Sequence, residues 1–112
     1  MKSKIVSLKN NKEFISLLKG KKITNRYSTI FFKKLYGKNT SKLNISFVTK
    51  KKIGNAVIRN KIKRRLRNIM NEMVKKKNIN LNYSYLLIAK KEIYQHNYDD
   101  IKKNLMTNLN KN

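Results

Sequence analysis

The spacing of the apolar residues changes near residue 50 of this 112-residue chain, from every second residue to every third or fourth. Apolar and polar residues alternate over residues 43–49, which is typical of a strand with one buried face. Over residues 56–77 the apolar residues follow a period of 3.6, which predicts a helix with one buried side. Because both periods occur in one short chain, we expect a single domain of the α/β class.

The remaining segments predict further elements around these two. Asn10 or Asn11 can cap a short helix that ends near Gly20. Residues 27–36 are rich in aromatic and β-branched residues, and the turn-forming residues 37–41 follow them, so we expect an antiparallel hairpin with residues 43–49. Residues 83–89 are mostly apolar and predict an inner strand, and residues 98–109 predict a last helix. Residues 1–8 are basic, and we expect them to be flexible.

The charge of the chain constrains its partners more than its fold. Lys and Arg number 29 against 5 Asp and Glu, which gives a formal net charge of +24. Self-repulsion on this scale disfavours a compact state unless a polyanion neutralises it, so a nucleic acid is the expected partner and a membrane surface is not. The chain has no cysteine and one histidine, so we expect no metal site and no catalytic triad of its own. No apolar stretch has the length of a membrane span or a secretory signal, and we expect a cytoplasmic protein.

Four of the five arginines lie within nine residues, on the predicted helix at residues 56–77. A guanidinium binds phosphate in a bidentate manner and stacks on bases, which a lysine ammonium does not do. The apolar stripe contains Ile58, Ile62, Leu66, Ile69 and Met73, and the opposite side contains Asn60, Lys63, Arg64, Arg67 and Asn71. We therefore predict that the stripe packs against the protein and that the opposite side binds RNA.

Residues 51–67, KKIGNAVIRNKIKRRLR, resemble the signature of the bacterial ribonuclease P protein subunit. The resemblance extends weakly over nearly the whole chain, through Phe14, the pair Asn25 and Arg26, and residues 85–90. It implies an α/β fold of the two-layer sandwich kind (α+β), with the order αβββαβα. It also implies a small mixed sheet and a left-handed βαβ crossover, although such crossovers are ordinarily right-handed.

The resemblance also implies roles for particular residues. The basic helix would bind the catalytic RNA, and a cleft between the sheet and the helices would bind the single-stranded 5′ leader of precursor transfer RNA. Two positions depart from the family pattern: Lys61 stands where an arginine is usual, and Leu18 stands where an aromatic residue is frequent. The RNA-binding residues implied are Lys51, Lys52, Arg59, Asn60, Lys61, Lys63, Arg64, Arg65 and Arg67, and the leader-cleft residues are Phe14, Leu18, Arg26 and Phe31.

The function implied is that of a protein subunit in an endoribonuclease whose RNA subunit performs the cleavage. The protein alone is expected to be inactive, with no catalytic or metal-binding residue. Mg²⁺ is expected in the holoenzyme and would be held mainly by RNA, and no further protein partner is required. Two alternatives remain open: a small basic ribosomal protein, and a DNA-binding module with residues 56–77 as its recognition helix. The strand pattern before that helix disfavours the second, because a helix-turn-helix would need a preceding helix.

Overall fold

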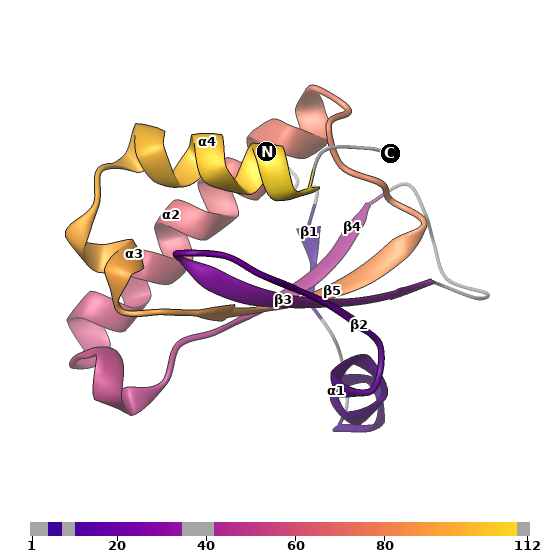
Figure 1. Cartoon of the computed structure of the whole chain (residues 1–112), viewed down its shortest axis with the longest axis horizontal. Helices are drawn as coiled ribbons and strands as arrows, with labels where there is room; N and C mark the ends of the chain where they lie inside the picture. The colour runs from indigo at the N-terminus through magenta and orange to yellow at the C-terminus, as the bar shows by residue number, and fades with distance from the viewer. Residues whose placement is uncertain (1–4, 8–10, 35–41, 110–112) are drawn as a thin grey trace.

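The computed structural model describes residues 5–7, 11–34 and 42–109 (Figure 1). The order αβββαβα is confirmed, and three short elements, β1, η1 and α3, are added to it. Along the chain the elements are β1 (Ile5–Val6), α1 (Asn11–Leu18), β2 (Lys21–Thr24), β3 (Ser28–Lys34), β4 (Leu43–Val48), the 3-10 helix η1 (Lys51–Ile53), α2 (Ala56–Lys75), β5 (Tyr83–Ala89), α3 (Glu92–Gln95) and α4 (Tyr98–Leu109).

The strands form one mixed sheet in the order β1-β4-β5-β3-β2. The predicted hairpin between β3 and β4 is wrong, because β5 lies between them: it pairs antiparallel with β3 and parallel with β4. The predicted inner position of β5 is confirmed. Its nearly continuous apolar sequence suits a strand that is flanked on both edges and covered on both faces. The turn predicted at residues 37–41 lies outside the described residues.

The crossover from β4 to β5 contains α2, as a parallel pair requires. Its handedness stays a prediction from the resemblance. The helix α2 ends at Lys75, two residues before the predicted end. Lys77 adopts a left-handed φ of 58°, and the N–H of Asn78 donates to the carbonyl of Met73 at 2.9 Å, so the chain turns away there without a glycine.

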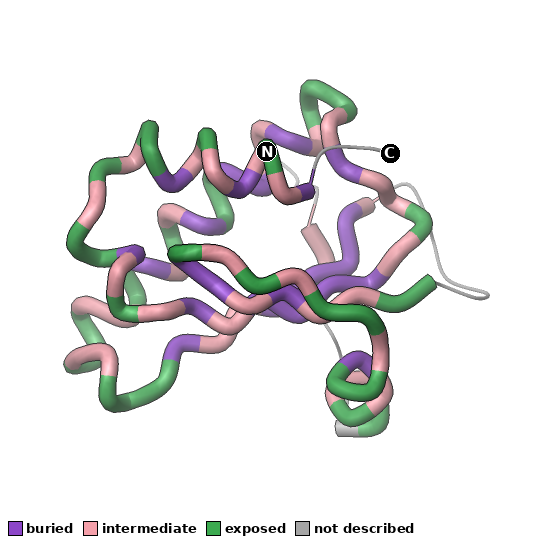
Figure 2. The backbone as a smooth tube through the Cα atoms, in the orientation of Figure 1, coloured by how far each residue is buried: buried purple, intermediate pink, exposed green. Residues whose placement is uncertain are grey.

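Helices cover both faces of the sheet, with α2, α3 and α4 on one side and α1 on the other (Figure 1). The main core lies between the sheet and α2 with α4, and Figure 2 shows buried segments on the inner strands and on the helix sides that face them. Leu17 on α1 and Leu86 on β5 are also buried but lie outside this core. The predicted two-layer sandwich therefore has α1 as a partial third layer. From α2 the core receives Ile62, Leu66, Ile69, Met70 and Met73.

Two expectations about the edge of the sheet need correction. Residues 1–8 were expected to be flexible, yet Ile5 and Val6 form β1 and pair in parallel with Leu43 and Asn44 of β4. This pairing makes β4 an inner strand, and its polar residues Asn44 and Ser46 are buried, at 7% and 9% exposure. The alternating pattern of β4 thus does not mark a solvent face. Residues 1–4 and 8 lie outside the described residues. No helix in the described part of the chain has the length and apolarity needed to cross a membrane.

Candidate nucleic-acid interface

The two sides of α2 are divided as the sequence predicts. Ile62 and Leu66 are 1% and 0% exposed, while Asn60, Arg64 and Arg67 on the other side are exposed to solvent. The helix therefore packs through its apolar stripe and presents its cations outward. We call the outward residues the basic face of α2: Arg59, Asn60, Lys61, Lys63, Arg64, Arg65 and Arg67, of which Arg59, Lys63 and Arg65 are half-buried.

The chain enters α2 through η1, where Lys51 and Lys52 are both exposed. Asn55 caps α2, because its side-chain Oδ1 accepts a hydrogen bond from the N–H of Ile58 at 3.0 Å. This cap, which the sequence analysis did not predict, satisfies one of the first-turn amides that a phosphate could otherwise bind. Gly54 packs closely on the same turn: a Cβ there would lie 3.0 Å from the side chain of Ile58. A side chain at residue 54 would therefore require the side chain of Ile58 to shift.

The basic face of α2 has no carboxylate of its own. None of the five acidic residues of the chain lies between Glu13 and Glu72. Glu72 is itself paired, since the Nζ of Lys102 on α4 lies 2.9 Å from its Oε1, and this hydrogen bond lowers the pKa of Glu72 below its ordinary value. Within the described part of the chain no carboxylate pairs with a cation of the basic face, so these cations are left for an external anion. The Nε of Arg59 is buried with no acceptor among the described residues, so this guanidinium lies against the protein surface.

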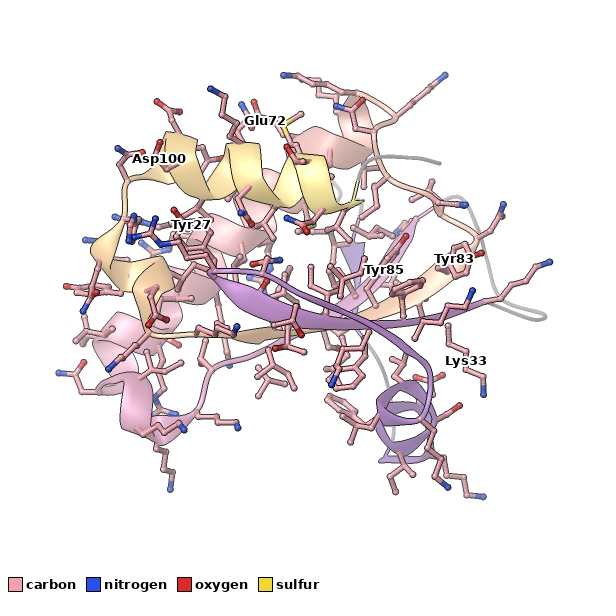
Figure 3. All side chains as sticks on the ribbon, in the orientation of Figure 1. Tyr27, Lys33, Glu72, Tyr83, Tyr85 and Asp100 are labelled. Atoms are coloured by element: carbon pink, nitrogen blue, oxygen red, sulfur yellow. The ribbon has the colours of Figure 1, made fainter. Side chains whose placement is uncertain are left out.

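A second surface lies on the opposite face of the sheet, beside α1. Phe31 on β3 is in register with Leu86 on β5, and Leu86 with Ser46 on β4, so the three side chains form one row on this face. Phe31 is half-buried, as is Phe14 on α1, and neither packs against the main core. Figure 3 shows Lys33 on the α1 side of the sheet. Its Nζ donates to Oγ of Ser16 at 2.7 Å, which ties α1 to β3.

The leader-cleft residues expected from the resemblance are only partly brought together. Phe14 and Leu18 share one flank of α1, four residues apart, and Leu18 is 50% exposed. Arg26 is placed elsewhere: its guanidinium lies 5.9 Å from the ring centroid of Tyr27, in a hollow of about 550 Å³ beside α4. The physical reason is the tight turn before β3, where Asn25 Oδ1 accepts the N–H of Tyr27 at 2.9 Å. That turn directs Arg26 toward α4 and away from α1.

A hollow of about 440 Å³ lies between the end of the sheet and η1. Thr29 and Ile88, whose side chains point to the α1 face, line it together with Lys50, Lys52 and Lys90. The hollow thus connects the α1 face with the lysines that precede α2. Lys50 and Lys90 are not among the site residues predicted from the sequence. Lys90 could have been predicted from its position directly after the inner strand β5. Its Nζ donates to the carbonyl of Asn25 at 2.7 Å.

The described residues contain no group of three or more His, Cys, Asp or Glu residues able to hold a metal ion. The one histidine, His96, packs edge-on against Tyr27 with ring centroids 5.1 Å apart, and its Nδ1 lies 3.3 Å from the Tyr27 hydroxyl. Since Tyr27 belongs to the core, we assign this pair a structural role.

The fold and these surfaces define a class: a small basic α/β protein with a cationic helix face suited to a polyanion. The Ribonuclease P family model matches residues 2–112, and the chain therefore belongs to the ribonuclease P protein family. The ribonuclease P protein component of Streptococcus agalactiae is 31% identical over 104 residues, which cover 92% of this chain and 90% of that protein. The ribonuclease P protein component of Listeria monocytogenes is 35% identical over 100 residues, which cover 88% of this chain and 81% of that protein.

Solved structures agree with this assignment. The ribonuclease P protein of Thermotoga maritima superposes with a TM-score of 0.78 at 25% identity, covering 93% of this chain and 94% of that one. A Staphylococcus aureus ribonuclease P protein superposes with a TM-score of 0.76 at 26% identity, and the superposition covers 92% of this chain and 84% of that one. The family assignment confirms the resemblance seen in the sequence. It does not support the ribosomal alternative or the DNA-binding one.

Proposed function

We propose that the basic face of α2 binds the RNA subunit of ribonuclease P and that the α1 face of the sheet binds the 5′ leader of precursor transfer RNA. The observation that carries the proposal is the division of α2 into an apolar side that packs into the core and an outward cationic side, the basic face, without carboxylates. Phosphates are the ligands that such a side recognises, because each Lys or Arg contact releases counterions from the RNA.

The leader assignment is supported by the half-buried rings on the α1 face. Phe14 and Phe31 lie outside the main core, and aromatic rings on an open sheet are a common platform for unpaired bases. The hollow lined by Lys50, Lys52 and Lys90 adds cations at one end of this face, where they would meet the phosphate backbone of the RNA leader. Arg26 is not part of this proposal, because it lines a different hollow beside α4.

We propose further that Mg²⁺ acts in the holoenzyme and is held mainly by RNA phosphates. The donor set of this chain does not fit such an ion: hard cations need several oxygen ligands, and the described residues offer no acidic cluster. The protein would contribute by binding and orienting the two RNAs. Both RNAs are made in the bacterial cytoplasm, and we propose that the protein acts there.

Reconstitution tests the proposed function. The protein, purified free of RNA, is expected to leave precursor transfer RNA uncut, and to promote cleavage at low Mg²⁺ when the RNA subunit from the same cell is added. Leader release would be followed on gels with each component omitted in turn. Robust, chelator-sensitive cleavage by nuclease-treated protein alone would contradict the proposal, and so would cleavage by the RNA that the protein fails to stimulate.

Leader binding can be separated from core packing at Phe31. Changing Phe31 to Ala is expected to weaken holoenzyme binding to precursor transfer RNA by about 1–3 kcal/mol, because one base loses its stacking partner. Binding of mature transfer RNA should hardly change, since it has no leader. Equilibrium binding of substrates with a leader of several nucleotides and of leaderless substrates measures both effects in one preparation.

The neighbouring Phe32 provides the matched control. It points to the other face of the sheet, packs against the core, and meets the ring of Tyr83 edge-on at 5.8 Å between centroids. Changing Phe32 to Ala should lower the free energy of unfolding by up to about 3 kcal/mol, because Phe32 is half-buried, and should leave leader dependence unchanged. If changes at Phe14 and Phe31 instead destabilise the fold and leave leader dependence intact, both residues belong to the packing of α1 and not to the site.

A further inference from the structure

An exposed aromatic ring stands beside the basic face of α2. Tyr94 on α3 is 42% exposed, although its neighbour Ile93 is buried at 2%. Val57, in the first turn of α2, is 75% exposed. Figure 1 shows α3 next to the N-terminal half of α2, and residues of the two helices are in contact. The ring of Tyr94 on α3 and the side chain of Val57 in the first turn of α2 are therefore both open to solvent.

A lysine of the basic face links this junction to the RNA-binding surface. The Nζ of Lys61 lies 6.0 Å from the centroid of the Tyr94 ring, within the range of a cation–π contact. Val57 and Lys61 are four residues apart on α2 and so lie on the same flank of the helix. The flank continues into the cations of Arg64 and Arg65. An aromatic ring and a cation thus lie close together on a strongly positive surface, and an exposed aliphatic side chain lies on the same flank of α2 as the cation.

We propose that Tyr94 is a base-stacking residue: an unpaired base of the RNA subunit stacks on its ring while Lys61 and Arg64 bind the adjoining phosphates. This inference rests on the proposed function, because it extends the contact surface of α2 onto α3. A base offers a flat apolar face with a charged backbone beside it, and this junction offers an aromatic ring with cations beside it. Lys61 lacks the bidentate guanidinium of an arginine and would act here as a single cation held near the ring.

The charge of the surroundings favours RNA over a protein partner. A second copy of this chain would bring its own net charge of +24 to the junction and would be repelled. A stable protein interface buries about 800 Å² on each partner, far more than two exposed side chains provide, whereas one stacked base needs only a single ring. An RNA ligand fits both the sign of the charge and the size of the apolar area.

Substitutions at Tyr94 test stacking against simple packing. Tyr94→Ala and Tyr94→Leu should each weaken binding of the RNA subunit by about 5- to 100-fold, because neither keeps a ring. Tyr94→Phe should restore the affinity. The dependence of affinity on salt should keep its slope in all three variants, since no charge is removed. Full affinity of Tyr94→Leu would overturn the proposal, because it would show that any apolar side chain of this size suffices.

The chain contains no tryptophan, so Tyr94→Trp places a single fluorescent reporter in the proposed site. The RNA subunit should quench its emission by stacking, and inorganic polyphosphate, which has charge but no bases, should not. Thr107→Trp, exposed on α4, is the control and should respond to neither. Equal responses to RNA and polyphosphate would overturn the proposal, as would equal quenching of both reporters.

The experiments distinguish an error in the proposed function from an error in the proposed stacking site at Tyr94. If the unchanged protein does not stimulate cleavage by the RNA subunit, the proposed function itself is wrong. If it does stimulate cleavage, while Tyr94→Ala binds RNA fully and Tyr94→Trp remains unquenched, the function stands and the stacking site is wrong. Thermal melts of each variant show whether the fold is retained, and we expect little change, because Tyr94 is well exposed.

Discussion

Replacing Leu66 with alanine is expected to lower the free energy of unfolding by about 2–5 kcal/mol, because its side chain is 0% exposed and its removal leaves a cavity between α2 and the sheet. Ile62→Ala should act in the same way and with similar size, since Ile62 is 1% exposed. Urea or thermal unfolding followed by circular dichroism measures both losses. RNA affinity, compared at a temperature where each variant is folded, should stay close to that of the unchanged protein.

Arg67, the next residue along α2, is the matched control for Leu66. It is exposed on the other side of the helix, so Arg67→Ala should change the free energy of unfolding by only a few tenths of a kcal/mol. The pair therefore tests the orientation of α2 with two adjacent residues. If Arg67→Ala unfolds the protein and Leu66→Ala weakens only RNA binding, the two faces of α2 are reversed.

The double variant Arg64→Ala with Arg67→Ala is expected to show the largest loss of RNA affinity. Each guanidinium that makes a charge-assisted hydrogen bond to phosphate contributes about 1–3 kcal/mol, so the two together contribute on the order of 2–6 kcal/mol if they act independently. The slope of log affinity against log salt should fall by about 1 for each phosphate that the variant no longer binds. Filter binding or fluorescence titration across a salt series gives both quantities.

A variant of equal charge separates this effect from a general decrease in attraction. Lys12 on α1 and Lys103 on α4 are exposed and lie outside the basic face, so changing both to alanine also lowers the net charge by two. We expect the affinity of this variant to fall much less. A decrease equal to that of the arginine pair would show that the RNA senses only the net charge of the protein and that α2 is not its specific binding surface.

The helix and its two sides were predictable because helical periodicity is local. Residues three and four apart meet on one face whatever the remainder of the chain does, so the alignment of Ile62, Leu66 and Ile69 already defines a buried side. The arginines follow the same period on the opposite side. The family motif at residues 51–67 then added the expected ligand, and the family assignment confirms the motif.

Strand pairing was not predictable in the same way, because it joins residues far apart in the sequence. The alternation in β4 correctly marks a strand, and the apolar run in β5 marks an inner strand, but neither pattern says which edge meets which neighbour. The insertion of β5 between β3 and β4 makes the hairpin wrong, β1 pairs with the other edge of β4, and Asn44 and Ser46 are buried in the assembled fold. Which strands become neighbours depends on how the whole sheet assembles, and not on the pattern within one strand.

By itself, then, the sequence determined the class of fold, the buried and charged sides of α2, and the polyanionic nature of the partner. These follow from local periodicity and from net charge, which do not depend on topology. Only the tertiary structure decided that Phe31 shares a face with Leu86, that Arg26 turns toward α4, and that Tyr94 lies near Lys61. Each of these depends on contacts between residues distant in the chain, and those contacts are set by strand order and by helix docking, which no local pattern encodes.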